Sequence, residues 1–197
     1  MQPKYKIIFL GTPEFAVPSI KALCEHAMSP VLIVSQPDRP QGRKKTIIPT
    51  PVHQFALEQN IPCYQPTKVR NQEFYNTLAK YEPDFLITAA YGRILTPEVL
   101  DLAGVEALNI HASLLPKYRG ASPVQHALIN GDQETGVSIM RMVEDMDRGP
   151  IFHQKSYTIP DGMKSDALMQ ALSYVAADIL PDTLDYIYDG KLEALPQ

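Results

Sequence analysis

Residues 109–116 read Asn-Ile-His-Ala-Ser-Leu-Leu-Pro and follow the largely apolar stretch 105–108. This pattern predicts a strand that ends at a turn, and side chains along a strand alternate between its two faces. Asn109, His111 and Ser113 then share one face, while the apolar residues between them share the other. A buried polar group without a partner costs roughly 1–3 kcal/mol. The three residues therefore indicate either a hydrogen-bonded core histidine with its neighbours or a functional site at a strand end.

The chemistry that suits Asn109 and His111 is attack on a carbonyl group. A neutral amide donates to a developing oxyanion without adding net charge. A histidine, with an ordinary pKa near ~6.5, donates to that oxygen or moves a proton at cellular pH. Neither Ser113 nor Cys63 lies in a nucleophile motif. The sequence favours direct transfer between two bound substrates over a covalent enzyme intermediate.

The turn at 143–150, Val-Glu-Asp-Met-Asp-Arg-Gly-Pro, offers three carboxylates. Most acidic turns are simply solvated. If this turn folds over the same crevice, then Glu144, Asp145 or Asp147 could raise the basicity of His111 or accept a proton through water. Position in the sequence does not choose among them.

The elements that must position these residues alternate between strands and helices, which predicts an α/β fold with a mostly parallel sheet and helices on both faces. In such sheets, ligands bind at the carboxyl ends of the strands. A Pro- and Arg-rich loop runs to Pro51, and the last two strands form an antiparallel pair (135–159) at one edge. The expected strands are 6–11, 31–36, 61–66, 84–92, 107–114, 135–143 and 149–159, and the expected helices are 13–27, 52–60, 71–81, 96–103, 122–131 and about 164–188.

The bulk composition fits one large globular domain. The chain has 197 residues, of which 45% are hydrophobic and 20% charged, and its net charge is −4. That charge argues against a surface covered in positive charge but allows a local basic patch. The two cysteines, Cys24 and Cys63, indicate free thiols in a reducing compartment. No apolar run approaches the ~20 residues of a membrane span, so we expect a cytoplasmic chain without membrane association.

Four blocks together resemble the methionyl-tRNA formyltransferase family: 9–23, 35–45, 109–128 and 135–150. The second pair of blocks is shared more widely among enzymes that use 10-formyltetrahydrofolate, and the first pair is more particular to the tRNA enzymes. The resemblance implies a Rossmann-like formyltransferase domain and a catalytic trio of Asn109, His111 and Asp147. It also implies that the substrate amine attacks the formyl carbon directly and that the reaction uses no metal.

The resemblance further implies where the two substrates bind. 10-Formyltetrahydrofolate, the formyl donor, is expected to contact Ser113, Leu114, Leu115, Pro116, Gly92, Arg93, Ile94, Leu95, Met142 and Glu144. The turn after the first strand lacks the spacing of a nucleotide-binding loop. It is expected beside the aminoacyl end of the substrate, with Thr12, Pro13 and Phe15 forming a methionyl pocket.

Basic side chains in the loop 38–45 form the one concentrated positive patch in an acidic chain. Many basic loops are simply solvated, but this loop is the place where a phosphate backbone could bind by charge. By resemblance this loop contacts the acceptor stem of initiator methionyl-tRNA. The expected tRNA-binding residues are Arg39, Arg43, Lys44 and Lys45, extended by Lys117 and Arg119. We expect a monomer.

We expect residues 1–189 to form the catalytic domain and 190–197 to begin a linker, with the family's C-terminal tRNA-binding barrel absent from this sequence. Two departures are local: Lys44 replaces a glycine in the basic loop, and Arg148-Gly149-Pro150 replaces Thr-Gly-Asp after Asp147. Two alternatives stay open. One is formyl transfer to a sugar amine or another small amine, and the other is a truncated folate- or RNA-binding remnant.

Overall fold

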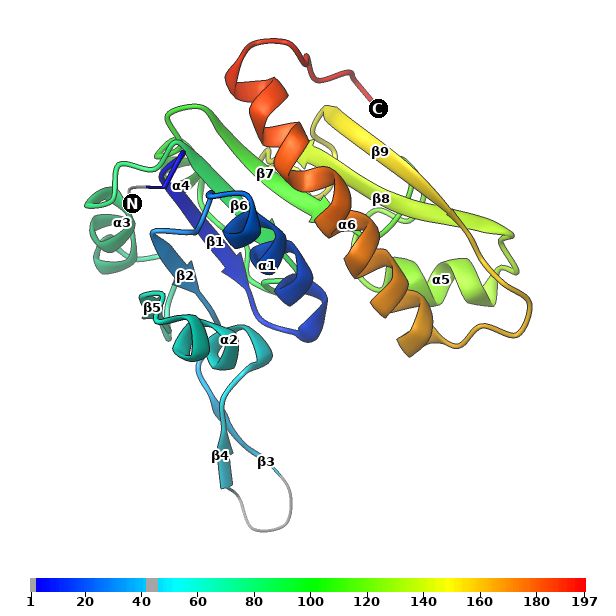
Figure 1. Cartoon of the computed structure of the whole chain (residues 1–197), viewed down its shortest axis with the longest axis horizontal. Helices are drawn as coiled ribbons and strands as arrows, with labels where there is room; N and C mark the ends of the chain where they lie inside the picture. The colour runs from blue at the N-terminus through cyan, green and yellow to red at the C-terminus, as the bar shows by residue number, and fades with distance from the viewer. Residues whose placement is uncertain (1–2, 42–45) are drawn as a thin grey trace.

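The computed structural model describes residues 3–41 and 46–197 and shows one main sheet with helices packed on it (Figure 1). The strands are β1 (Ile7–Gly11), β2 (Leu32–Val34), β3 (Arg39–Gln41), β4 (Thr46–Ile48), β5 (Cys63–Tyr64), β6 (Phe85–Ala89), β7 (Glu106–His111), β8 (Glu134–Arg141) and β9 (Ile151–Thr158). The helices are the 3-10 helix η1 (Glu14–Ala16), α1 (Val17–Glu25), α2 (Pro51–Gln59), α3 (Gln72–Ala79), α4 (Pro97–Leu100), α5 (Pro123–Ile129) and α6 (Ser165–Tyr188).

The main sheet has seven strands in the order β5-β2-β1-β6-β7-β8-β9. Strands β5, β2, β1, β6 and β7 are parallel, whereas β8 runs antiparallel to both of its neighbours. The chain builds outward from β1 to β2 and β5, then returns to the other side of β1 to form β6. This reversal places the carboxyl ends of β1, β6 and β7 beside a topological switch point, where open α/β sheets bind ligands. The predicted fold class and the late antiparallel pair are confirmed.

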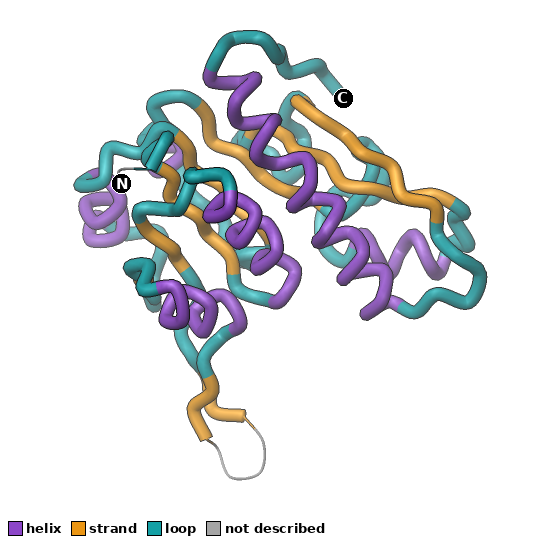
Figure 2. The backbone as a smooth tube through the Cα atoms, viewed as in Figure 1, coloured by secondary structure: helices purple, strands orange, loops and turns teal. Residues whose placement is uncertain are grey.

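Helices cover both faces of the sheet because each face presents an apolar layer. One core cluster joins Phe9 and Leu108 with side chains from α1, α2, α5 and α6, and the other joins Ile8 and Leu86 with side chains from α3 and α4. Figures 1 and 2 view the sheet from the side on which α1 and α6 cross in front of the strands. The strands buried on both faces explain the near-continuous apolar runs of the sequence.

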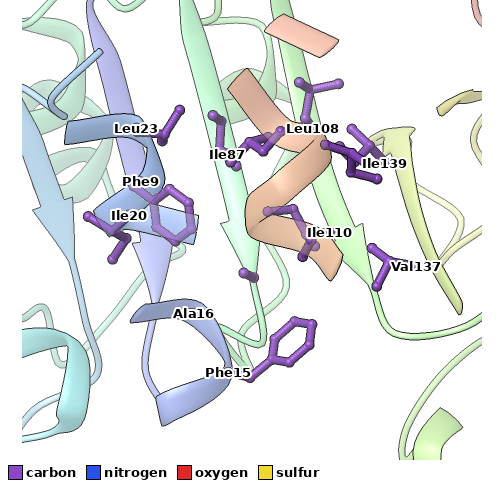
Figure 3. Close-up of a cluster of buried hydrophobic side chains, with 14 of the residues drawn as sticks. Phe9, Phe15, Ala16, Ile20, Leu23, Ile87, Leu108, Ile110, Val137 and Ile139 are labelled. Carbon is purple, nitrogen blue, oxygen red and sulfur yellow. The ribbon is translucent and has the colours of Figure 1, made fainter. Parts of the chain in front are cut away.

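The core beneath α1 and α6 fixes the position of β7. Figure 3 shows Ile87, Leu108 and Ile139 gathered from three adjacent strands, and all three are fully buried. Burying a side chain of this size stabilises the fold by roughly 1.5–3 kcal/mol. Because Leu108 and Ile110 are anchored in this layer, the residues that alternate with them are turned to the opposite face of the sheet.

Gly11 ends β1 and lets η1 pack directly on the strand. A Cβ atom at this position would lie 2.8 Å from Cβ of Ala16 and 3.2 Å from the carbonyl oxygen of Ala89. We expected a helix from residue 13, and the structure has η1 followed by α1. The glycine therefore serves the close approach of η1 to the sheet.

Strands β3 and β4 form a separate antiparallel hairpin that projects away from the main sheet (Figure 1). Our prediction of an irregular loop up to Pro51 was wrong for these two strands. The side chains of β4 are all exposed. The strand therefore lacks the alternation of apolar and polar residues by which a half-buried strand is predicted from sequence. The predicted tRNA contacts of Arg43, Lys44 and Lys45 fall outside the described residues.

A polar network around Asp38 holds the base of this hairpin. The Asp38 carboxylate accepts hydrogen bonds from Nε2 of Gln65 (2.7 Å), Nδ1 of His53 (2.9 Å) and the backbone N–H of Thr50 (3.1 Å). Burial favours a higher pKa for Asp38, but the bonds from Gln65, His53 and Thr50 outweigh it and the net pKa is lowered. The hairpin is thus tied to α2 and to the residue that follows β5.

Two helices begin without a side-chain cap. Thr96 and Ser122 occupy the N-cap positions of α4 and α5, where threonine and serine are common, but neither side chain makes a capping hydrogen bond to its helix. Ser122 has φ 60°, a left-handed backbone that turns its hydroxyl away from the usual capping geometry.

Candidate active site

Asn109 is oriented by a neighbour on β6. Thr88 and Asn109 are register partners in the parallel pair β6–β7, so their side chains lie side by side on one face of the sheet. The Thr88 hydroxyl donates to Oδ1 of Asn109 at 2.8 Å. In this bond the hydroxyl meets the amide oxygen, which leaves the amide nitrogen of Asn109 to face the other groups of the site.

Asp147 reaches Asn109 from the loop between β8 and β9. Its Oδ1 accepts from Nδ2 of Asn109 at 3.2 Å, and its Oδ2 accepts from the backbone N–H of Gly120 at 2.8 Å. The side chain of Asp147 is 13% exposed, whereas Glu144 and Asp145 are exposed residues of the same loop. Of the three carboxylates in the acidic turn, Asp147 is the one that reaches the strand-end face.

His111 lies at the end of β7 on the same face as Asn109 and is buried. Its Nε2 lies 2.9 Å from the carbonyl oxygen of Tyr118. A carbonyl oxygen only accepts, so Nε2 carries the hydrogen of this bond and Nδ1 is the nitrogen turned toward the other groups. Nδ1 lies 3.6 Å from Oδ2 of Asp147, which is longer than a hydrogen bond but close enough for charge stabilisation.

The close approach of the β8–β9 loop depends on Gly149. A Cβ atom there would lie closer than 3.0 Å to the carbonyl oxygen of Arg141, at the end of β8. No side chain fits in that space, so glycine lets the two sides of the loop converge. Asp147 has φ 52°, a left-handed conformation that is uncommon for residues other than glycine. The loop thus presents the carboxylate through a tight turn.

The segment 113–116 is held by polar side chains from β8 and β9, of which Ser138 is buried. The Ser138 hydroxyl donates to the carbonyl oxygen of Ser113 (2.6 Å) and accepts from the N–H of Leu115 (3.1 Å). Nε2 of Gln154 donates to the carbonyl oxygen of Leu115 at 2.9 Å, and the Ser113 hydroxyl donates to that of Lys117 at 2.6 Å. Ser113 and Leu115 are buried by these contacts, and Pro116 is exposed. The side chain of Ser113 is thus engaged within the turn itself.

The second set of predicted folate contacts lies on the Asn109 face of the sheet. Met142 packs on the cluster that includes Tyr91 and Leu95, and its Sδ lies 3.3 Å from the Thr88 hydroxyl. Ile94 remains 55% exposed. The residues Gly92, Arg93 and Glu144 are exposed as well. Met142 and the segment 91–95 therefore lie on the side of the sheet to which Asn109 points.

Tyr91 precedes that segment and is buried to 3% exposure. Within the described part of the chain its hydroxyl has no hydrogen-bond partner. Burial raises the pKa of Tyr91 to about 12, so the phenol keeps its proton at neutral pH.

The residues of the predicted methionyl pocket differ in how far they are buried. Phe15 is 5% exposed and belongs to the core cluster, while Pro13 is exposed. The Thr12 hydroxyl lies 3.4 Å from the carbonyl oxygen of Tyr91 and 3.4 Å from the backbone N–H of Gln36. Thr12 therefore links the carboxyl ends of β1, β2 and β6.

The predicted tRNA-binding residues within the described ranges are exposed at separate points. Arg39 lies on β3, with Nη2 3.4 Å from Oε1 of Gln36. Nζ of Lys117 lies 3.6 Å from a carboxylate oxygen of Asp132. Arg119 donates from Nε to Oε1 of Gln197 at 2.9 Å.

Further residues, not predicted from the sequence, support the site. Thr88 orients Asn109, and Tyr118 and Gly120 hold His111 and Asp147 through backbone groups. Thr88 is the one polar residue of the strand Phe85–Ala89, and this could have indicated its role from the sequence. Backbone contacts carry no residue signature, so Tyr118 and Gly120 had none.

Two further properties concern metals and membranes. Within residues 3–41 and 46–197, no group of three or more His, Cys, Asp or Glu side chains is arranged to hold a metal ion. Of the helices in the same ranges, none combines the length and apolarity that crossing a bilayer requires.

Comparison with known sequences identifies close relatives. A methionyl-tRNA formyltransferase from Acetivibrio thermocellus is 44% identical over 193 residues, covering 98% of this chain and 62% of that protein. One from Listeria monocytogenes is 46% identical over 192 residues, covering 98% of this chain and 61% of the relative. The chain thus spans about three fifths of the length of the curated relatives it matches.

Solved structures share the fold at lower identity. Glycinamide ribonucleotide transformylase 1 from Symbiobacterium toebii superposes with a TM-score of 0.77 at 19% identity, covering 97% of this chain and 94% of that one. A sugar N-formyltransferase from Shewanella gives a TM-score of 0.72 at 16% identity, covering 98% and 73%. Residues 5–184 match the formyl transferase family, a range that includes every strand of the main sheet. The chain belongs to the formyl transferase family.

Proposed function

We propose that the chain transfers the formyl group of 10-formyltetrahydrofolate to the amino group of initiator methionyl-tRNA. The observation that carries the proposal is the convergence of Asn109, His111 and Asp147, with Nδ2 of Asn109 3.2 Å and Nδ1 of His111 3.6 Å from the Asp147 carboxylate. The high identity to relatives named methionyl-tRNA formyltransferase supports this choice of acceptor.

The proposed reaction joins the amine nitrogen to the formyl carbon and breaks the bond from that carbon to the folate nitrogen. 10-Formyltetrahydrofolate supplies the formyl group. One hydrogen on Nδ2 of Asn109 is donated to Asp147, and the second is not used by any hydrogen bond within the described residues. In the proposal, this second hydrogen is donated to the formyl oxygen as negative charge develops on it.

In this proposal His111 accepts the proton of the attacking amine and passes it to the departing nitrogen. The attacking amine loses one proton and the departing nitrogen gains one, so a group between them must hold it. Since Nε2 of His111 is engaged with the Tyr118 carbonyl, Nδ1 is the position for that proton. A positive imidazolium formed there lies 3.6 Å from the carboxylate of Asp147, which stabilises it.

The folate is proposed to bind on the Asn109 face, beside segment 92–95 and Met142. The exposed apolar side chain of Ile94 and the half-buried Met142 offer a surface for a flat ring, and the polar groups of the segments 92–95 and 113–116 offer hydrogen bonds to its edge. Arg39, Arg43, Lys44, Lys45, Lys117 and Arg119 are proposed to contact tRNA phosphates, and Thr12, Pro13 and Phe15 to lie near the methionyl group. Residues 1–189 are proposed as the catalytic unit.

The test is formyl transfer from 10-formyltetrahydrofolate to methionyl-tRNA, measured for the unaltered chain, for Asn109→Ala and for Asn76→Ala. Removal of an oxyanion donor lowers kcat by about 10²–10³-fold, so Asn109→Ala is expected to fall in that range. Asn76 is an exposed residue of α3, and its variant is expected to match the unaltered chain.

A parallel assay with an amino sugar as acceptor distinguishes the main alternative. Transfer to the sugar amine without transfer to methionyl-tRNA would replace the proposed acceptor. Folate binding with no transfer to either acceptor would reduce the chain to a binding module.

A further inference from the structure

The segment after α6 returns to the start of the edge strand β9, next to the loop that contains Asp147. Ile151 and Leu195 exchange two backbone hydrogen bonds, of 2.8 and 2.9 Å, which form an antiparallel bridge on the edge strand β9. In Figure 1 the C-terminal segment runs back past the start of β9. The bridge brings Gln197, which lies two residues further on, beside the loop that contains Asp147.

The side-chain amide of Gln197 makes three hydrogen bonds at this loop. Its Nε2 donates to the carbonyl oxygens of Asp147 (2.9 Å) and Gly149 (2.7 Å). Its Oε1 accepts from Nε of Arg119 at 2.9 Å. A primary amide supplies both donors and the acceptor, whereas a carboxylate in the same place could only accept.

Three consecutive residues connect this amide to the catalytic groups. The carbonyl of Tyr118 accepts from His111, the side chain of Arg119 holds Gln197, and the backbone N–H of Gly120 donates to the carboxylate of Asp147. Gln197 and the segment 118–120 therefore hold the Asp147 loop from two sides. The left-handed backbone of Asp147, at φ 52°, is uncommon and persists where surrounding contacts determine it.

We propose that Gln197 is a positioning residue for Asp147, acting through the backbone of residues 147–149. Gln197 sets the carboxylate at its distance from Asn109 and His111 by fixing the loop, and it touches none of the reacting atoms. The kinetic part of this inference rests on the proposed function. It implies that the position of the segment 190–197 affects formyl transfer.

The test compares Gln197→Glu and Gln197→Ala with Leu195→Ala. In Gln197→Glu the carboxylate keeps its partner Arg119 but faces the two carbonyl oxygens without a hydrogen to donate. Leu195 is 68% exposed and pairs only through its backbone, so its substitution to alanine is the matched control. Removal of two hydrogen bonds is expected to lower kcat of both Gln197 variants by about tenfold or more, with KM for methionyl-tRNA and folate changed less than twofold.

A second measurement does not depend on turnover. The amide hydrogen of Gly120 reports the place of the Asp147 carboxylate directly, because it is donated to Oδ2. Amide exchange followed by NMR is expected to accelerate at Gly120 in both Gln197 variants and to stay unchanged in Leu195→Ala.

The outcomes separate this inference from the proposed function. Unchanged kcat in both Gln197 variants would overturn the positioning role even if exchange accelerated, because the amide would then only fasten the tail. Absence of formyl transfer by the unaltered chain would remove the proposed function. Amide exchange at Gly120 would then decide whether Gln197 positions the carboxylate. An unchanged exchange rate in the Gln197 variants would overturn the positioning role.

Discussion

At the scale of single residues, the site depends on the direction of one amide. Asn109 could present either its oxygen or its nitrogen to a ligand, and the carboxylate of Asp147, which only accepts hydrogen bonds, selects the nitrogen. The Thr88 hydroxyl, 2.8 Å from Oδ1, donates to the oxygen and holds the same orientation. Asn109 is thus a donor whose direction is set before any substrate arrives, the arrangement that oxyanion stabilisation requires.

Replacement of Thr88 by valine tests this orientation. The valine keeps the shape of threonine and removes the donor, so Asn109 loses one hydrogen bond worth about 1 kcal/mol. We expect kcat for formyl transfer to fall by about fivefold, with little change in KM for either substrate. The control is Thr88→Ser, which retains the hydroxyl and should keep most of the activity. Equal rates for the valine and serine variants would contradict the role given to the hydroxyl.

At the scale of secondary-structure elements, strand alternation was enough to predict the polar face of β7. Leu108 and Ile110 lie in the core and turn Asn109 and His111 to the opposite side, as the sequence indicated. The residues alone left three carboxylates open in the acidic turn. The resemblance selected Asp147, and its role remains a prediction. The contacts of Asp147 depend on the fold of the β8–β9 loop, which composition does not encode.

Other parts of the structure have no usable signal in the sequence. The hairpin β3–β4 contains a proline and exposes both faces of β4, so it lacks the periodicity that marks a strand. Gln197 contacts Asp147 across fifty residues of sequence. Such a contact follows from how α6 ends and how the chain turns back to β9, and neither is visible in a local pattern.

The β8–β9 loop should not tolerate a side chain at Gly149. In Gly149→Ala the new methyl group would lie closer than 3.0 Å to the carbonyl oxygen of Arg141, and backbone atoms on both sides resist displacement. We expect the free energy of unfolding to fall by about 1–3 kcal/mol, as in other overpacked positions, together with reduced formyl transfer.

Urea unfolding measures this effect, with Gly104→Ala as the matched control. At Gly104 the added methyl group would lie 3.5 Å from the nearest atom, an ordinary contact. If Gly149→Ala unfolded at the same urea concentration as Gly104→Ala, the tight loop geometry would be refuted.

The Asp38 network predicts a pH-dependent contribution from the base of the β3–β4 hairpin. Because the pKa of Asp38 in the folded chain lies below its ordinary value of 3.8, the ionised carboxylate stabilises the fold above that pH. The contribution is lost as the pH falls through the lowered pKa. Asp38→Asn should therefore be less stable than the unaltered chain at pH 6, and the difference should shrink below about pH 3.8.

Urea unfolding across this pH range, with Asp161→Asn as control, checks the prediction. Asp161 is exposed in the turn before α6, and its variant should track the unaltered chain at every pH. A stability difference for Asp38→Asn that stayed constant between pH 6 and pH 3 would rule out the linkage.

At the scale of the whole molecule, the net charge does not attract RNA, and only local groups of basic side chains do. The net charge of −4 gives no overall attraction to a polyanion, so the proposed tRNA contact depends on a few basic side chains. Arg39, Lys117 and Arg119 are exposed at different points of the described chain. Arg43, Lys44 and Lys45 add three charges close together in the sequence.

Substitution of Arg43, Lys44 and Lys45 together by alanine should weaken tRNA binding and its salt dependence. For every phosphate that the variant no longer neutralises, the slope of log K against log salt is expected to become shallower by about 0.9 on a double-stranded stem. Gel-shift titrations with methionyl-tRNA at several salt concentrations measure that slope. An unchanged slope would show that the basic loop binds no phosphates.

The pairing of Thr88 with Asn109 has a consequence for how the folded state is recognised. A slip of one residue between β6 and β7 would reverse which face of the sheet each side chain occupies. Asn109 and His111 would then point into the layer beneath α1 and α6, away from Asp147. A population with slipped pairing could match the native chain in circular dichroism and still be inactive. Specific activity per folded molecule is therefore a sensitive measure of correct strand register, and refolding yields should be scored by it.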